Sequence, residues 1–422
     1  KYYKHAGTQL TKPMRAFHNV ITRKLLVGTY SNIFNNKSIF DMSAGRGGDI
    51  HAWYNIGIDK HYLMDINDGN IGEDIDTDKD NTLHGRLYGM KTPNLNELHN
   101  YKYLIDRSKW ANDAQFNIFS GDMSKDLSAH KSLFDDKTNE PVKVDCIPLF
   151  FSLHYIFNSE QNVEQLLYNV STHLKPNGVF LVTTFDGERI FNALRNKDKI
   201  TGEYTEIRNG NKTTKELWSI KKTKGYKTHE SKYKTTGFPD NKDSLGFGIE
   251  VSTDTFEGET EYLVHPTYLI NTARKYGLEL ISRKELEVLY DKKIINTSTG
   301  NFDNIYNNME QFNFRTVGKN KMKDLHLFKK RPELQTFSYF NRYYVFINRA
   351  DFNTNFYKTT QECKNDTNNI NGTTNVLLRQ AIFTMENQDN IIEHINEQRA
   401  YNGVSNKNNK NNKVADIKSK VN

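Results

Sequence analysis

Five short apolar runs, each followed directly by polar or charged residues, constrain the fold of this 422-residue chain more than any other feature. The runs lie at 38–42, 62–64, 116–119, 144–153 and 179–182. They alternate with segments of helical periodicity at 13–28, around 50–54 and at 163–174. Near-continuous apolar strands that alternate with helices are typical of a parallel sheet covered on both faces. We therefore expect an α/β fold built on a mostly parallel sheet.

The residues that follow the runs are the candidates for a ligand site, because ligands of such sheets bind at the carboxyl ends of the strands. The first run leads into a glycine-rich loop, Ser43-Ala44-Gly45-Arg46-Gly47-Gly48-Asp49, whose glycines allow close approach of the backbone to a ligand. Asp65 ends the second run and suits a bidentate bond to ribose hydroxyls. Asp122 follows the third and suits an adenine amino group, and His154 and Tyr155 follow the fourth. Any single one of these residues could instead be an ordinary turn or helix-terminal residue.

The spacing of the glycine loop argues against a dinucleotide. It does not follow G-x-G-x-x-G, and Asp49 would place a carboxylate where a pyrophosphate would bind the helix N-terminus. An acidic residue there favours a cationic or amine-bearing ligand. The strand-end residues together fit S-adenosylmethionine better than NAD.

Composition adds weaker limits. The chain carries 58 Lys and Arg against 51 Asp and Glu, and this net charge of +7 is only a mild preference for polyanions. Aromatic residues reach 12%, which indicates a real core. No apolar run approaches the roughly 18 residues needed to cross a bilayer, and two cysteines cannot build a disulfide framework. The chain begins at Lys1 without a Met, so we expect a module of a longer protein.

The second half of the chain is interrupted by polar segments. Residues 197–260 are Lys-rich with β-like alternation at 247–251, and we expect an insertion there that carries substrate contacts. A helix at 265–276 and strands at 278–281 and 343–347 return to the core. From 351 the chain is Asn-rich and is expected to be a mobile tail, with a short helix possible at 375–394.

An ordered set of motifs resembles the mRNA cap guanine-N7 methyltransferases, in the form found in capping enzymes of poxviruses and giant viruses. The motifs are DMSAGRGGD (41–49), YLMDIN (62–67), SGDMSKDL (120–127), FFSLHYIF (150–157), KPNGVFLVTTFDGERI (175–190) and EYLVHP (261–266). The resemblance covers about residues 10–350. It implies a class-I S-adenosylmethionine-dependent methyltransferase fold, Rossmann-like, with a mostly parallel seven-stranded sheet, helices on both faces and a β-rich insertion. The methyltransferase domain would span 1–350, and the tail 351–422.

The resemblance also implies roles for individual residues. The methyl donor S-adenosylmethionine would contact Ser43, Gly45, Gly47, Asp65, Asp122, Met123, Phe150 and Tyr155. The cap and RNA would contact Asn19, Arg46, His154, Tyr155, Glu261 and Tyr343, with Tyr344 as an alternative to Tyr343. His154, Tyr155 and Glu261 would be the catalytic residues, acting by position and charge without a general base and without a metal. The family's donor-contacting Lys is replaced by Thr22, with Arg23 and Lys24 as possible substitutes.

Two other classes of function stay open from the sequence. One is another class-I methyltransferase, acting on a ribose hydroxyl of RNA, a small molecule or a protein. The other is a catalytically silent RNA-binding or stimulatory capping subunit. A dinucleotide-dependent dehydrogenase is the least supported class, because the glycine loop lacks the dinucleotide-binding spacing. The expected partners are the capped 5′ end of mRNA, upstream triphosphatase and guanylyltransferase domains in the same polypeptide, and a stimulatory subunit, with no membrane. We expect an intracellular protein, cytoplasmic if viral and nuclear if cellular.

Overall fold

The computed structural model describes most of the chain up to residue 349. The described residues are 9–28, 37–72, 81–93, 101–209, 211–233, 237–254, 258–283, 286, 294–311 and 319–349. The predicted tail at 351–422, with its possible helix at 375–394, lies outside the described residues.

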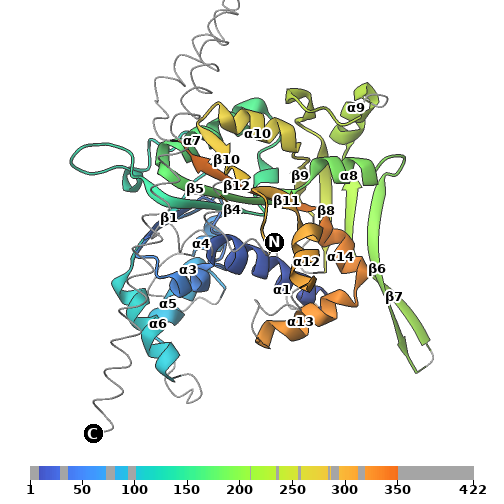
Figure 1. Cartoon of the computed structure of the whole chain (residues 1–422), viewed down its shortest axis with the longest axis horizontal. Coiled ribbons are helices and arrows are strands. Elements are labelled where there is room, and N and C mark those ends of the chain that lie inside the picture. The colour runs from blue at the N-terminus through green and yellow to red at the C-terminus, as the bar shows by residue number, and fades with distance from the viewer. Residues whose placement is uncertain are drawn as a thin grey trace, which may run out of the picture.

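A mixed eight-stranded sheet runs through the middle of the molecule (Figure 1). Its order is β10-β12-β5-β4-β1-β2-β3, and β11 pairs with β12. Neighbours from β3 to β5 are parallel, whereas β12 is antiparallel to both β5 and β10. This is the strand order of class-I methyltransferases, so the predicted fold class is confirmed, with β11 as an eighth strand. The strands are β1 Ser38–Asp41, β2 Lys60–Asp65, β3 Gln115–Ser120, β4 Val144–Phe150, β5 Leu174–Phe185, β10 Leu278–Leu280, β11 Thr299–Asn301 and β12 Asn341–Asn348.

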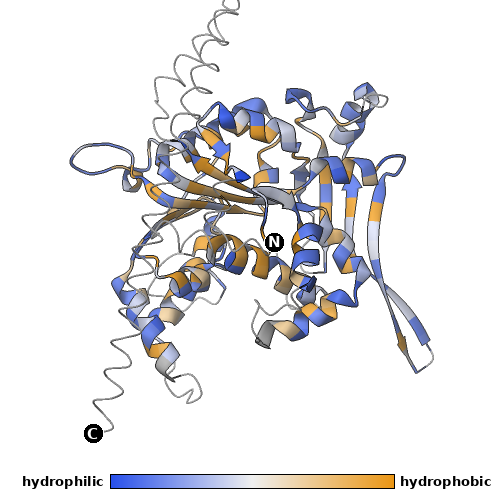
Figure 2. Cartoon of the chain, in the orientation of Figure 1, coloured by the Kyte–Doolittle hydropathy of each residue, from blue (hydrophilic) through white to orange (hydrophobic). Residues whose placement is uncertain are grey.

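Helices cover both faces of this sheet, as its apolar strands require. In Figure 1, α7 and α10 lie on one face and α1 and α3 on the other. Figure 2 shows the strands between them as largely apolar. Two clusters of buried side chains correspond to the two faces, and Phe180 and Leu181, neighbours on β5, belong to different ones. The helices of the sheet region are α1 Lys12–Asn19, α3 Ile50–Ile56, α4 Asp68–Ile71, α5 Leu83–Lys91, α6 Tyr101–Asp113, α7 Glu160–His173, α8 Gly187–Ala193 and α10 Pro266–Arg274.

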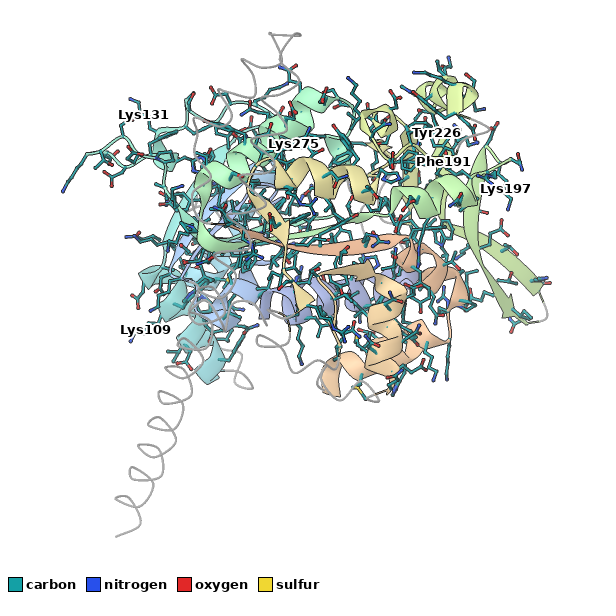
Figure 3. All side chains as sticks on the ribbon, turned by 45° about the horizontal axis from the view of Figure 1, so that its top comes forward. Lys109, Lys131, Phe191, Lys197, Tyr226 and Lys275 are labelled. Atoms are coloured by element: carbon teal, nitrogen blue, oxygen red, sulfur yellow. The ribbon has the colours of Figure 1, made fainter. Side chains whose placement is uncertain are left out.

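The predicted insertion forms a second, four-stranded antiparallel sheet in the order β6-β7-β8-β9, on the right in Figure 1. Its elements are β6 Lys199–Arg208, β7 Asn211–Lys222, α9 Lys224–Tyr233, β8 Gly248–Thr253 and β9 Thr260–Tyr262. Stacked aromatic rings join it to α8. Phe191 on α8 and Tyr226 on α9, both labelled in Figure 3, have ring centroids 6.2 Å apart. The predicted insertion ends at residue 260, but its last strand continues to Tyr262. Glu261 is therefore part of the insertion sheet.

Three differences from the sequence analysis matter for the site. Strand β4 ends at Phe150, so the prediction of one strand from 144 to 153 is wrong at its end. The N-terminal helix changes after α1 into a π-helix over Val20–Leu26, a rare form that is often found at functional sites. Three helices, α12 Phe302–Gln311, α13 Lys319–Lys329 and α14 Pro332–Tyr339, were not predicted and lie beside α1 in Figure 1.

Candidate functional site

The glycine-rich loop joins β1 to α3 in a conformation that needs glycine at two places. Gly45 and Gly47 have φ values of 53° and 68°, in the left-handed region that other residues rarely adopt. A Cβ on Gly47 would also come within 2.6 Å of the side chains of Ile50 and Leu83. The loop therefore leaves the sheet in a sharp turn that backbone hydrogen bonds stabilise: the N–H of Ala44 donates to the Met64 carbonyl and the N–H of Gly47 to the Ala44 carbonyl, both at 2.9 Å.

Asp65, the last residue of β2, is a buried acceptor that organises this loop. Its Oδ2 accepts the N–H of Gly45 at 2.8 Å, and its Oδ1 accepts from the Asn67 N–H at 2.9 Å and the Asn70 side-chain amide at 3.1 Å. A carboxylate oxygen offers two lone pairs. Oδ2 therefore keeps one position for a ligand hydroxyl, whereas Oδ1 would have to release Asn70. The predicted bidentate ribose contact stays a prediction and needs that rearrangement.

The next strand ends supply a mixed polar and apolar lining. Asp122 follows β3, and its Oδ1 accepts from both the N–H and the hydroxyl of Ser124. Met123 is buried, and its carbonyl accepts the side-chain amide of Asn169 at 3.0 Å. Ile66, directly after Asp65, is 71% exposed and was not predicted as a site residue. An apolar residue immediately beyond a strand-end acid is the signal that could have identified it as a surface for a flat ring.

A sharp backbone turn follows β4 and directs the next residues toward the loop. Phe151 has φ 55°, a strained conformation for an aromatic residue and one that occurs preferentially at functional sites. Phe150 is half-buried at the strand end. The hydroxyl of Ser152 lies 2.8 Å from that of Ser43, which ties the turn to the glycine loop. Neither Phe151 nor Ser152 was predicted, because a strained φ leaves no trace in sequence pattern.

The turn places His154 against Glu261, which comes from β9 of the insertion. The two side chains are buried, with 4% and 3% of their surface exposed. Nε2 of His154 and Oε2 of Glu261 are 3.5 Å apart, and neither atom has a hydrogen-bond partner among the described residues. Nδ1 of His154 lies 3.5 Å from the Thr184 hydroxyl, and the Tyr155 ring packs edge-on against the imidazole.

Burial decides the charge of this pair. It raises the pKa of the Glu261 carboxyl to about 8, with a further contribution from the charge of Glu259. It lowers the pKa of His154 to about 3. Both groups are therefore neutral in the larger part of the population at pH 7. The 3.5 Å contact is consequently a pair of desolvated polar groups and not an ion pair, despite the opposite charges that these residue types can carry.

The cation opposite Asp49 comes from the chain itself. Arg23, on the π-helix, forms an ion pair with the Asp49 carboxylate at the N-terminus of α3. The argument that Asp49 selects a cationic ligand is therefore weakened, because the protein supplies the countercharge. Thr22 uses its hydroxyl within the helix, donating to the His18 carbonyl at 3.2 Å. Of the possible substitutes for the family's Lys, Arg23 is thus the one in contact with the loop.

The remaining predicted cap residues lie in different surroundings. Arg46 donates from Nε to the Asn70 side-chain carbonyl at 3.2 Å, and Asn19 is half-buried at the end of α1. Tyr343 is 2% exposed, and its hydroxyl donates to the Thr297 carbonyl at 2.8 Å. Tyr344 is fully buried in the opposite core. A cap contact by Tyr343 stays a prediction and would require the hydroxyl to exchange Thr297 for the ligand.

Four lysines of the insertion pair with carboxylates. Lys199 contacts Glu216, Lys221 contacts Glu250, and Lys227 contacts Asp198. Lys222 is buried and binds both oxygens of Glu230 at 2.7 Å. Part of the positive charge that could attract RNA is therefore neutralised locally.

The residues present fit the predicted methyl donor. The strand ends offer a backbone loop stabilised by Asp65, an exposed apolar side chain at Ile66, and three acids around the loop, Asp41, Asp49 and Asp65. The pKa of buried Asp41 is raised, chiefly by burial and also by the charge of Asp49. Arg23 already balances the charge of Asp49, so positive charge on a ligand would act mainly on the repulsion between Asp41 and Asp65. Within the described ranges, no group of three or more His, Cys, Asp or Glu residues could hold a metal ion, and no helix is long and apolar enough to span a bilayer.

Comparison with known proteins identifies the domain. Residues 95–326 match the model of the mRNA (guanine-N(7))-methyltransferase domain, and this segment contains Asp122, His154, Tyr155 and Glu261. The chain is 31% identical over 324 residues to a probable mRNA-capping enzyme of Acanthamoeba polyphaga mimivirus, covering 73% of this chain and 24% of that protein. It is 28% identical over 223 residues to the mRNA cap guanine-N(7) methyltransferase of Meyerozyma guilliermondii, covering 51% of this chain and 36% of that protein.

The chain thus spans between about a quarter and about a third of these two relatives. Among solved structures, the CcbJ methyltransferase of Streptomyces caelestis matches 77% of this chain and 90% of its own, at 11% identity and a TM-score of 0.36. That score is too low to support an argument about function. The matched segment, the mimivirus relative and the strand order agree, and the chain belongs to the mRNA (guanine-N(7))-methyltransferase domain family.

Proposed function

We propose that this chain transfers the methyl group of S-adenosylmethionine to N7 of guanine in the 5′ GpppN cap of mRNA. The observation that carries the proposal is the buried contact between Nε2 of His154 and Oε2 of Glu261, both without a partner among the described residues. Buried polar atoms in proteins are nearly always hydrogen-bonded. Two buried polar atoms without partners favour the binding of a ligand that presents a complementary donor and acceptor at the same spacing.

Guanine is the base with that complement. Its Watson–Crick edge carries the O6 acceptor next to the N1–H and N2–H donors. If Nδ1 of His154 accepts from the Thr184 hydroxyl, Nε2 carries the proton and donates to O6. Glu261, in its deprotonated form, then accepts from N1–H and the amino group. Adenine presents an amino donor and a bare N1 at these positions, and would leave both protein groups unsatisfied at a cost of about 1–3 kcal/mol each.

The same contact favours the transition state. Positive charge passes to the purine as the methyl group arrives, so the N1–H and amino donors become more acidic. Their hydrogen bonds to a carboxylate strengthen as the reaction proceeds, which is stabilisation specific to the transition state. Tyr155, packed on His154, would complete the wall of the pocket.

No general base is needed, because the N7 lone pair is free at neutral pH. The protein has to align N7 with the methyl carbon and exclude water. Such alignment can supply about 7–11 kcal/mol in favourable cases. The strained turn at Phe151 and the bond between Ser43 and Ser152 support this alignment, since they join the loop expected to hold the donor to the segment that carries His154.

We assign the donor to the glycine loop and the neighbouring strand ends. When bound, S-adenosylmethionine supplies an electrophilic methyl group on a sulfonium sulfur. Ser43, Gly45 and Gly47 would surround its methionine part, with Phe150 and Tyr155 alongside. Asp65 would accept a ribose hydroxyl through the free position on Oδ2, and Ile66, Asp122 and Met123 would frame the adenine. Arg46, beside the loop, is proposed to approach the cap phosphates.

The decisive experiment locates the methyl group. The chain is incubated with methyl-labelled donor and RNA ending in GpppA or GpppG, and the product is digested with nuclease and chromatographed. We expect label in 7-methylguanosine. Label on the ribose would indicate a 2′-hydroxyl methyltransferase, and donor binding without any methylation would indicate a silent subunit.

The wider partners are also proposals. The mimivirus relative is described as a probable mRNA-capping enzyme and is much longer than the present match. We therefore propose that this domain works with triphosphatase and guanylyltransferase domains in one polypeptide. A measurable turnover by the chain alone would show that no stimulatory subunit is required; activation by an added subunit would show the reverse.

We also propose that residues 1–350 contain the whole methyltransferase activity and that 351–422 contribute none. Every residue assigned a role above lies before 350. A chain ending at residue 350 should keep the turnover and the donor affinity of the full chain within twofold, and a larger loss would give the tail a part in the reaction.

A further inference from the structure

Two of the backbone hydrogen bonds that join the insertion to the rest of the domain lie close in sequence to the proposed guanine pair. The N–H of Gly246, ahead of β8, donates to the Phe157 carbonyl at 3.0 Å. The N–H of Gly187, the first residue of α8, donates to the Val264 carbonyl at 2.9 Å. Phe157 lies three residues after His154, and Val264 lies three residues after Glu261. Each contact is therefore close in sequence to one member of the pair.

Gly187 has no room for a side chain at its contact. A Cβ there would lie 2.6 Å from the Val264 carbonyl oxygen, 2.9 Å from its carbonyl carbon and 2.8 Å from a ring carbon of Phe238. Distances below 3.0 Å to backbone atoms cannot be relieved by rotating a side chain. A larger residue at 187 would push the segment that follows β9 away from the end of β5.

The opposite side of this contact is held rigidly. Asp186 is 1% exposed and accepts from the Asn301 side chain at 2.7 Å and from Nε of Arg342 at 2.8 Å. It also caps α8 by accepting the N–H of Arg189 at 3.2 Å. Residues of β5, β11 and β12 all hold this turn in place. A clash at residue 187 would therefore displace the less firmly held segment from β9 to α10, which carries Glu261.

We infer that Gly187 is a positioning residue for the methyl transfer, because its contact with Val264 sets where Glu261 stands relative to His154. The inference rests on the function proposed above. It gives a role to the FDGER segment after β5, which no step of the proposed mechanism uses. Glycine is required here by the close approach of two backbones, and a displacement of about 1 Å at a reacting site can cost on the order of a hundredfold in rate.

The test compares Gly187→Ala with Gly225→Ala. Gly225 lies in α9 of the same insertion, and a Cβ there would meet only the Thr223 hydroxyl oxygen at 3.7 Å, an ordinary contact. We expect Gly187→Ala to lower kcat/KM for capped RNA by about 10- to 100-fold. Donor affinity measured by calorimetry should stay within twofold, which also shows that the variant is folded. Gly225→Ala should match the wild type in both.

A second readout does not depend on methylation. The Glu261 carboxyl is followed by NMR titration after selective Glu labelling, with Glu261→Gln used to assign its signal. Displacing Glu261 from its buried site should admit water and move its titration midpoint down from about 8, which a general loss of stability would not do. An unchanged midpoint and unchanged cap kinetics in Gly187→Ala would overturn the inference.

The two proposals fail in different ways. A wild-type chain that leaves capped RNA unmethylated would defeat the proposed function, while the titration would still report on Gly187. If Gly187→Ala does not fold, Gly246→Ala disturbs the second contact, the one on the His154 side, and should change the same two readouts. A Cβ on Gly246 would lie 3.0 Å from Nε2 of His229, at φ 84°. If Gly246→Ala binds the donor and keeps the wild-type midpoint and cap kinetics, the placement of Glu261 relative to His154 does not depend on how the insertion is attached, and the inference is overturned.

Discussion

The N–H of Gly45 donates to Oδ2 of Asp65 across 2.8 Å, so the glycine loop and the end of β2 form one hydrogen-bonded unit. The loop therefore depends on Asp65 even before a ligand binds. Asp65 thus shapes the loop, and in the proposed site it would also offer an acceptor to the donor ribose.

Asp65→Ala should weaken donor binding by at least about tenfold, because a buried acceptor of several hydrogen bonds is lost. Calorimetric titration with S-adenosylmethionine or S-adenosylhomocysteine measures this. Asn70→Ala is the matched control, since it frees a position on Oδ1 of Asp65 and should leave affinity equal or higher. Donor affinity that is unchanged in Asp65→Ala would remove the ribose assignment.

Above about pH 8, where Glu261 is deprotonated, Glu261→Gln should reduce turnover on capped RNA by about 100- to 1000-fold, the usual cost of removing one electrostatic group from a transition state. The amide keeps the size of the side chain but can accept fewer hydrogen bonds and carries no charge. Donor affinity should stay within twofold. Equal losses of turnover and donor affinity would instead make Glu261 a structural residue.

The pH profile of kcat/KM for capped RNA should rise as pH increases and level off above about 8. Glu261 has a raised pKa of about 8, so it is protonated below that value and gains its full accepting capacity above it. His154, with its pKa lowered to about 3, stays neutral throughout this range. Steady-state rates between pH 6 and 9.5 test this, and Glu261→Gln should have a flat profile over the same interval.

The free energy of unfolding of the ligand-free protein should change with pH in the opposite direction to kcat/KM: the contribution of Glu261 falls as pH rises. In the unfolded chain Glu261 loses its proton near pH 4.5, but in the folded protein it keeps the proton until about 8. The folded state therefore binds one more proton between these values, and this residue lowers stability as pH rises through that window. Glu261→Gln should be more stable than the wild type at pH 8.5, by up to a few kcal/mol at about 1.4 kcal/mol per pKa unit. The two proteins should converge near pH 4 in thermal unfolding, and a gap that does not depend on pH would contradict the burial of an ionisable carboxyl.

Tyr343→Phe separates packing from cap binding. The hydroxyl bonds to the Thr297 carbonyl, so its loss should cost about 1 kcal/mol of stability. If Tyr343 also contacts the cap, KM for capped RNA should rise severalfold while donor affinity is unchanged. A lower Tm with unchanged KM would restrict Tyr343 to the core.

The sequence was sufficient for the fold class and for the parts of the site that are local in the chain. Asp65 and Asp122 stand directly after apolar strands, and the parallel sheet gathers such residues at one edge. Glu261 could be named only through a motif, because its position beside His154 depends on the insertion sheet and on the tertiary contacts that hold this sheet in place. The end of β4 was misjudged because Phe151 and Leu153 are apolar residues that continue the run, although the backbone turns at Phe151.

Other relationships had no sequence signal at all. The pairing of Arg23 with Asp49 depends on the π-helix, whose extra residue per turn changes which side chains face the loop. The three helices after residue 301 are short and polar, and they bury their apolar sides against α1, the insertion, one another and the strands β11 and β12. Their existence depends on tertiary packing, which helical periodicity alone does not reveal.

The position of β12 has a consequence for synthesis of the chain. Residues 341–348 are last among the described strands in sequence but occupy a place between β5 and β10 in space. Until the ribosome has released them, β5 has an unpaired edge and β10 has no neighbour to join. A nascent chain that has already made the glycine loop, His154 and Glu261 therefore still lacks a closed sheet, and translation must run to about residue 348 before the domain can fold as one unit.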